Sequence, residues 1–293
     1  MTKSQLHIVL VLVLIQVLFG INFPASKIVV AKMDPFLWSN LRFLIAGFIM
    51  LVISLLSRRQ HPRLNKDFLL PVFTLSLLGM ALGQGLFLIG LAKTTSINSS
   101  IIITFIPILT LLIVILRKQE TVTFNKCIGI IMSFMGVILM RNITQFNLSN
   151  STFIGDIFVF LGALCFALYL SFGKKFFMKY DNLWSTTWMF LISGFVMSLF
   201  NLNKMSMLDL SSFDSEFYYC ASFSILFATL LTYFLNNWAL KHAPSAHVAV
   251  FIYLQPVVAG IIGFLYLGEI VTIRMFVSGM LIMSGLLFTL RKN

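Results

Sequence analysis

The sequence predicts an all-α integral membrane protein with ten transmembrane helices, arranged as two inverted five-helix repeats. The composition, the apolar runs and an internal repeat lead to this prediction. The 293 residues are 59% hydrophobic and only 10% charged, which is more apolar surface than a soluble fold can bury. A helix that crosses a bilayer needs about 20 mostly apolar residues. The continuous apolar runs favour such helices over the alternating strands of a membrane β-barrel.

The apolar runs define the expected helices. They lie near residues 7–30, 35–56, 68–91, 96–116, 126–140, 153–174, 184–202, 217–240, 245–267 and 273–290. The first run continues through Phe23-Pro24 without a small-residue cleavage site, so we interpret it as a span and not as a removed signal peptide. The fifth run is short.

An internal repeat links two stretches of the chain at a constant spacing. Pro107 and Pro256 each precede, by the same thirteen residues, a Glu-x-Val-Thr sequence that begins at Glu120 and at Glu269. Five apolar runs separate the copies, and this odd number means that the second copy faces the opposite way across a membrane. We therefore divide the chain into repeats of residues 1–147 and 148–293, linked by the Asn-, Ser- and Thr-rich segment 142–152. Inverted repeats are typical of secondary transporters.

The net charge of +12 first suggests a nucleic-acid partner, but its distribution indicates membrane topology. With the N-terminus inside, 14 of the 21 basic residues fall on the cytoplasmic side. The seven basic residues counted on the outer side are Lys27, Lys32, Arg42, Lys93, Arg141, Lys204 and Arg274. The positive-inside rule then places both termini in the cytoplasm of a multi-pass cell-membrane protein, expected in a bacterial inner membrane. No nucleic-acid partner is expected.

The sequence predicts neither a metal nor a cofactor. Cys127, Cys165 and Cys220 fall in or beside the apolar runs, without the spacing of a disulfide framework or of a metal site. The H-E-x-x-H and G-x-S-x-G signatures and an intramembrane aspartate pair are also missing from the sequence. A membrane-embedded enzyme is therefore a distant alternative, as is a scaffold, and we expect no enzyme.

The nine acidic residues bear on the cargo. None lies in the middle of an expected span, whereas a pump for cationic drugs would hold a deep carboxylate. Asp156 is expected to open the sixth helix. Glu120 and Glu269 are expected to cap the helices that follow them, with an ion pair that controls access to a cavity as the alternative.

Uncharged polar side chains inside the spans are the candidate substrate-binding groups. In the eighth run Thr229, Tyr233 and Asn236 recur at intervals of three and four residues, so they share one helix face. Such groups donate and accept hydrogen bonds, which suits a zwitterionic or uncharged polar solute. The predicted set is Asn22, Gln84, Tyr169, Tyr233, Asn236, Asn237, Tyr253 and Gln255.

Other residues are candidates for conformational change or proton coupling. Pro107 and Pro256 remove backbone hydrogen bonds within spans and are candidate hinges. Lys27, near the outer end of the first span, is either an interfacial anchor or a contact for an anionic group. His247 and Asp156 are the candidate proton sites.

Small residues at intervals of four indicate close helix packing. Gly79 with Gly83, and Ala163 with Ala167, let helix backbones approach one another. We favour packing within one chain, with a homodimer contact as the alternative. The other expected partner is membrane lipid.

Taken in order, several short motifs resemble the EamA-type family of the drug/metabolite transporter superfamily. They are Phe19-Gly20-Ile21-Asn22-Phe23 with Lys27, Pro35 with Arg42-Phe43, Glu120-x-Val-Thr, Gly155-Asp156, Gln255-Pro256 and Gly268-Glu269-x-Val-Thr. Two positions depart from the family pattern, since Phe19 replaces Trp and Gln119 replaces Gly. The resemblance implies ten helices, a central cavity between inverted halves, and export of amino acids or other metabolites.

These observations predict a secondary transporter that moves small polar metabolites by alternating access. Amino acids or their derivatives are the first expectation, and export is the expected direction. The alternative is an uptake or exchange carrier for a metabolite such as a nucleotide or S-adenosylmethionine.

Overall fold

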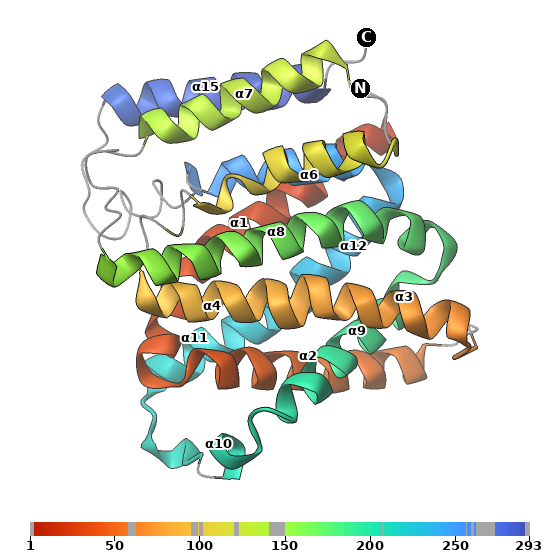
Figure 1. The fold of residues 1–293 in the computed structure, drawn as a ribbon, viewed down its shortest axis with the longest axis vertical. Coiled ribbons are helices and arrows are strands. Elements are labelled where there is room, and N and C mark those ends of the chain that lie inside the picture. Colours follow the sequence, from red (N-terminus) through yellow and green to blue (C-terminus); the bar gives the residue numbers. More distant parts are fainter. Residues whose placement is uncertain are drawn as a thin grey trace.

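A computed structural model describes residues 3–57, 63–94, 99, 102–119, 123–140, 150–206, 208–255, 257–258, 261 and 273–290. The regular elements within these ranges are helices, and they lie roughly side by side in one bundle (Figure 1). The start of α1 and the end of α15 lie at the same end of the bundle (Figure 1).

The first half of the chain forms long apolar helices with short connections. Its elements are α1 (Lys3–Lys32), α2 (Pro35–Leu56), α3 (Lys66–Ser76), the π-helical segment η1 (Leu77–Leu82), α4 (Gly83–Lys93), α6 (Ile106–Leu116) and α7 (Phe124–Met140). α3, η1 and α4 run on as one helix of 28 residues, Lys66–Lys93.

The second half has a similar order of elements. They are α8 (Asn150–Lys179), α9 (Asn182–Ser198), α10 (Leu202–Ser206), η3 (Leu210–Ser212), α11 (Ser215–Ile225), the π-helical η4 (Leu226–Leu231), α12 (Thr232–His242), α13 (Ser245–Val250), η5 (Phe251–Tyr253) and α15 (Ile273–Leu290). Each of the ten expected segments contains a described helix. Within the described residues five helices are long and apolar enough to cross a membrane, so the count of ten spans stays a prediction.

The helix lengths themselves repeat along the chain. α1 and α8 each contain 30 residues. α3 and α11 each contain 11 residues, and each runs into a π-helical segment of 6 residues and then a second α-helix of 11 residues. Both π-helical segments, which result from one extra residue in a helical turn, therefore occupy equivalent positions. The N-caps repeat as well: Asp34 and Asp181 cap α2 and α9, and Asn65 and Asp214 cap α3 and α11.

The contact between α7 and α15 joins equivalent positions of the two halves. These helices lie side by side in Figure 1. Ser133 Oγ donates a hydrogen bond of 3.2 Å to the carbonyl of Ile282, which is its counterpart at the repeat spacing. Gly136 packs on Ile282, and at the equivalent positions Gly285 packs on Ser133, so the same contact occurs twice. A residue that touches its own counterpart marks a local two-fold axis between the halves.

α1 and α8 run in opposite directions, as equivalent helices of inverted halves must. Lys27, near the end of α1, donates to the carbonyl of Leu91 near the end of α4. Asp156, near the start of α8, accepts a hydrogen bond of 2.5 Å from Thr94, which follows α4. The end of α1 and the start of α8 therefore lie together (Figure 1).

The expectation that Asp156 opens the sixth helix is wrong. α8 begins earlier, at Asn150, so Asp156 lies in its second turn. This residue is 5% exposed, and its carboxylate bonds the Thr94 hydroxyl across the α4–α8 contact. Tertiary contact, rather than capping, therefore explains an acid at this position. The last three residues of the expected linker, 150–152, are helical, and 142–149 lie outside the described residues.

Candidate functional site

A central cavity lies among α1, α4, α6, α8, α12, α13 and η5. It contains about 740 Å³ of space free of protein atoms, its open mouth included. Much of the wall is apolar, including Phe19, Phe23, Phe87 and Phe166. The polar side chains in the wall are Gln16, Asn22, Ser26, Gln84, Asn236 and Gln255. Acidic and basic side chains are missing from the wall as far as the described residues define it.

The cavity lies where the two halves meet. Phe19 and Phe166 stand at the same place in the equivalent helices α1 and α8, counted from the first residue of each, and both line the cavity. Ile103 and Ile252 are separated by the spacing of the sequence repeat, and they line it as well. Equivalent positions therefore face the same space, and the cavity is built on the symmetry between the repeats.

Hydrogen bonds tie the amide side chains of the wall to neighbouring side chains. Arg42 donates to Gln84 Oε1 at 2.9 Å, Gln255 Nε2 donates to Gln16 Oε1 at 2.7 Å, and Ser224 donates to Asn22 Oδ1 at 2.5 Å. Guanidinium groups only donate, so Arg42 must face the amide oxygen of Gln84. In this arrangement each amide keeps at least one N–H that can donate to a further partner.

Four of the eight predicted binding residues line the cavity, namely Asn22, Gln84, Asn236 and Gln255. Their binding role stays a prediction. The other four are not part of the lining. Tyr169 donates through its hydroxyl to Asn237 Oδ1, and Asn237 Nδ2 donates to Thr186 Oγ1 at 2.9 Å. These two residues therefore link α8, α12 and α9 behind the wall.

Tyr233 and Tyr253 are also buried away from the cavity. The Tyr233 hydroxyl donates to the Gly79 carbonyl at 3.3 Å, which joins α12 to η1. Its ring lies edge-on to Phe19, Phe43 and Phe190, at centroid distances of 6.2, 6.0 and 5.8 Å. The Tyr253 hydroxyl is buried and finds no hydrogen-bond partner in the described part of the chain. The tyrosines are thus packing residues in this structure.

The predicted set of binding residues omits three residues of this region. Gln16 and Ser26 line the cavity beside Asn22. These polar positions, together with Phe19 and Phe23, follow a helical period of 3.6 along α1, and that face is a signal that could have found them. Arg42 is the third, and the charge count places it on the outer side. The structure adds that Arg42 is only 1% exposed inside α2, where it bonds Gln84.

Lys27 and Lys174 are equivalent lysines that bind helix C-termini. Lys27 Nζ donates to the Leu91 carbonyl at 3.1 Å, in the last turn of α4. Lys174 Nζ donates to the Leu240 carbonyl at 3.3 Å and to the Ala243 carbonyl at 2.7 Å, at the end of α12. The last carbonyls of a helix lack intrahelical donors, and the helix dipole favours a cation there.

The remaining candidates do not gather at the cavity. Pro107 occupies the first turn of α6, where its missing N–H breaks no bond, just after a turn at Thr104-Phe105. His247 lies against the backbone of Thr289, away from the cavity lining. Pro256, Glu120 and Glu269 lie outside the described residues. Side chains able to hold a metal do not cluster anywhere in the described ranges.

Two stretches of the chain match the same family of known proteins. The sequence profile described as the EamA-like transporter family matches residues 6–142 and again residues 153–291. The chain belongs to the EamA-like transporter family. The resemblance read from the short motifs is therefore confirmed, and the protein is a multi-pass membrane transporter.

Relatives of this EamA-like transporter cover nearly its whole length. The uncharacterized transporter YyaM of Bacillus subtilis is 25% identical over 288 residues, which is 97% of this chain and 93% of that protein. An uncharacterized transporter of Archaeoglobus fulgidus is 26% identical over 97% of this chain and 99% of its own length. One solved crystal structure superposes with a TM-score of 0.78 over 98% of this chain and 96% of its own. At 14% identity that likeness shows the fold alone.

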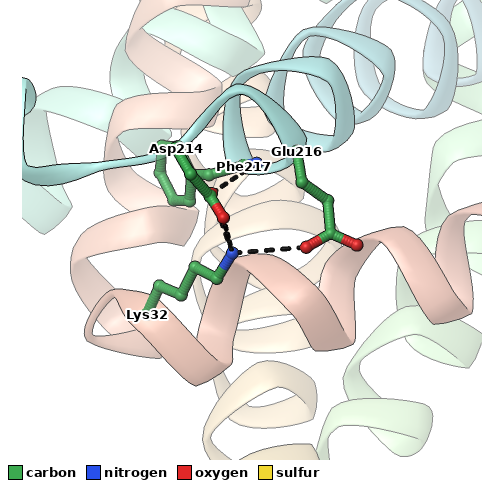
Figure 2. A network of polar contacts seen from close by, with 4 residues as sticks. All are labelled: Lys32, Asp214, Glu216 and Phe217. Atoms are coloured by element: carbon green, nitrogen blue, oxygen red, sulfur yellow. Dashed lines mark hydrogen bonds and ion pairs between the residues drawn. The ribbon is translucent and has the colours of Figure 1, made fainter.

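Ion pairs tie the two halves of this EamA-like transporter together at one end of the bundle. Lys32, the last residue of α1, lies 2.7 Å from Asp214 and 3.4 Å from Glu216 at the start of α11 (Figure 2). Lys204 of α10 lies 2.7 Å from Asp34, the N-cap of α2. Each pair joins a residue of the first half to one of the second half. We call these the terminal ion pairs.

The terminal ion pairs lower the pKa of two aspartates, Asp214 and Asp34. The hydrogen bond from Lys32, with that from the Phe217 amide, lowers the pKa of Asp214 (Figure 2). Burial alone would raise the pKa of Asp34, but hydrogen bonds from Lys204 and from the Leu37 and Phe36 amides outweigh it and lower that pKa. Both acids also cap helices, so the same carboxylates serve two stabilising contacts.

Proposed function

We propose that this chain is a secondary transporter that exports small polar metabolites, amino acids or their derivatives first, by alternating access. The observation that carries this proposal is the central cavity. Its wall combines polar and aromatic side chains, and equivalent positions of both repeats contribute to it. A binding site at the junction of inverted repeats can be exposed to either side when one half moves against the other.

The chemistry of the wall supports a polar solute. Six polar side chains face a largely aromatic and aliphatic surface, which is the usual balance in sites that orient a small molecule. A cationic drug would need a carboxylate to offset its desolvation. Acids are missing from the described lining, which argues for a zwitterion, an anion or a neutral polar solute.

The terminal ion pairs support the alternating-access part of the proposal. They bridge the halves at the end of the bundle that holds the end of α1, which the charge distribution predicts to be outside. Among the described residues, bridging ion pairs occur at this end and not at the other. We infer that the structure represents a state closed toward the predicted outer side, and that export requires these pairs to open.

Counterflow in proteoliposomes tests the function. Purified protein is reconstituted with one unlabelled solute inside, and the labelled solute is supplied outside, across a panel of amino acids, nucleotides and S-adenosylmethionine. We expect accumulation of an amino acid or derivative, and a pH gradient added in parallel reports on proton coupling. If folded protein accumulates no member of the panel, the proposal for polar metabolites fails.

A further inference from the structure

Arg42 is a buried cation for which the described residues offer no anionic partner. It lies in α2, which is apolar and 22 residues long, and its side chain is 1% exposed. Among the described residues its guanidinium donates to the neutral Gln84, and its Nε is buried without an acceptor. Arg42 forms no ion pair with any acid in the described ranges. A charge inside a membrane protein is costly and is, by default, a sign of a functional site.

Gln84 stands between the charge of Arg42 and the cavity. Its Oε1 accepts from Arg42, its NH₂ lies beside the Tyr233 hydroxyl with a second N–H to donate, and Gln84 is part of the cavity wall. A hydrogen-bonded amide beside a cation is polarised, which makes its N–H groups stronger donors. The wall at this point therefore presents a donor with positive charge behind it.

The other polar groups of the wall also have donors to spare. The amide oxygens of Gln16 and Asn22 are already bonded, by Gln255 and Ser224. Asn236 Nδ2 and Ser26 Oγ are buried in the wall and have no partner among the described residues. Unused donors and one nearby cation favour a ligand group that accepts hydrogen bonds and carries negative charge.

We propose that the cavity binds the carboxylate of a small organic acid or amino acid at Gln84, with Arg42 as the positive charge that attracts it. The carboxylate would accept from Gln84 Nε2, and the remaining donors of the wall lie within the same cavity. This inference rests on the proposed function and narrows its substrates to carboxylate-bearing solutes. Arg42 is a positioning and electrostatic residue here, because Gln84 stands between it and the cavity.

The substitution Gln84→Glu tests this proposal with little change of shape. The new carboxylate would take the place of the ligand's charge beside Arg42, so an external carboxylate should lose its attraction while the fold is kept. Gln119→Glu is the matched control. It also places a carboxylate beside an arginine, Arg117, but Arg117 is exposed and both residues lie off the cavity wall.

The measurement is the rise in unfolding temperature of the purified full-length protein with acetate, propionate or L-alanine, each compared with its amide. We expect the carboxylates to stabilise the wild type and Gln119→Glu more than the amides do. In Gln84→Glu the apparent affinity should fall about tenfold or more, as expected for losing a hydrogen bond to a charged group. Equal shifts for acids and amides in the wild type, no shift with any acid, or an unchanged response in Gln84→Glu would each overturn the proposal.

The same panel separates this inference from the function on which it rests. Carboxylate binding without any counterflow would leave the site standing and remove the transport proposal. Counterflow of neutral polar solutes, without a preference for carboxylates, would keep the transporter and remove the carboxylate site.

Discussion

Lys27 and Lys174 make the same contact at equivalent positions of the two halves of the chain. Each donates to a carbonyl in the last turn of a helix, and the two acceptors, Leu91 and Leu240, are themselves equivalent. Because α1 and α8 run in opposite directions, the two contacts lie at opposite ends of the bundle (Figure 1). A fold made of two inverted copies therefore carries the same lysine contact at both ends.

Replacing either lysine by methionine, Lys27→Met or Lys174→Met, should destabilise the protein by about 1 kcal/mol. Methionine keeps an apolar chain of similar length, so the loss reports on the bond to the helix terminus. Thermal unfolding of the purified variants measures it, and both should shift in the same direction. A loss in only one variant would show that the contacts are not functionally equivalent.

Asp214→Asn should weaken the closed end of the bundle without removing the helix cap. Asparagine is as good an N-cap as aspartate, but it cannot pair with Lys32. In a background without Cys127, Cys165 and Cys220, the variant Ser26→Cys places a thiol in the cavity wall. Its labelling by a membrane-impermeant thiol reagent should rise about two- to fivefold when Asp214→Asn is added, as expected for one exposed ion pair.

The control for that experiment is Asp209→Asn. Asp209 is an acid of the same connection, it caps η3 through Ser211, and within the described residues it forms no ion pair. Labelling should not change in this variant. Equal increases for Asp209→Asn and Asp214→Asn would mean that the charge of the loop matters and the pair with Lys32 does not.

The effect of Asp214→Asn on this labelling should depend on pH only in the acid range. Because Lys32 lowers the pKa of Asp214 in the folded protein, the contribution of this pair is present above the ordinary aspartate pKa, about 3.9. It is lost as the pH falls through the lower, folded value. Because thiol reagents react with the thiolate, the rate for Ser26→Cys is compared at each pH with the rate for the same protein carrying Asp214→Asn. We expect the ratio of the two rates to be constant between about pH 8 and 5 and to approach one below about pH 4, where Asp214 is protonated and the pair is lost in both proteins. A change centred near neutral pH would assign the closed state to another titrating group.

The π-helical segments set which side chains reach the cavity. Deleting one residue, Leu230, from η4 should restore a regular α-helix and turn α12 by about 100° relative to α11. Asn236 would then leave the cavity wall, so solute binding should be lost while helix content, measured by circular dichroism, is kept. Deleting Leu78 from η1 should move Gln84 in the same way. Binding that survives both deletions would contradict the lining described here.

Much of the architecture could be predicted from the sequence because lipid imposes simple rules. Spans must be long, apolar and helical. The two π-helical segments are separated by the same number of residues as Pro107 and Pro256, so the sequence repeat predicts where the second half repeats the first. Asn22, Gln84, Asn236 and Gln255 were found because intramembrane polar groups are rare and costly. All four line the same cavity.

The sequence was a poorer guide to orientation within the helices. A period of 3.6 residues groups Thr229, Tyr233 and Asn236 on one face. The extra residue in η4 turns Thr229 relative to α12, and within α12 the Tyr233 ring packs in an aromatic cluster while Asn236 lines the cavity. No simple sequence pattern predicts a π-helical turn. Arg42 entered the sequence analysis only as a charge to be counted, and a charge count says nothing about a side chain that bonds Gln84 inside the bundle.

The measurement that tests the central claim most directly is counterflow by the wild type and by Asn236→Leu in the same proteoliposome assay. Gly279→Ala is the control, since a Cβ at Gly279 meets nothing within 4 Å. We expect solute accumulation by the wild type and the control. In Asn236→Leu, a folded protein whose cavity lacks one polar group, we expect the rate of counterflow to fall at least roughly tenfold. Equal flux in all three proteins would contradict the claim that solute passes through this cavity.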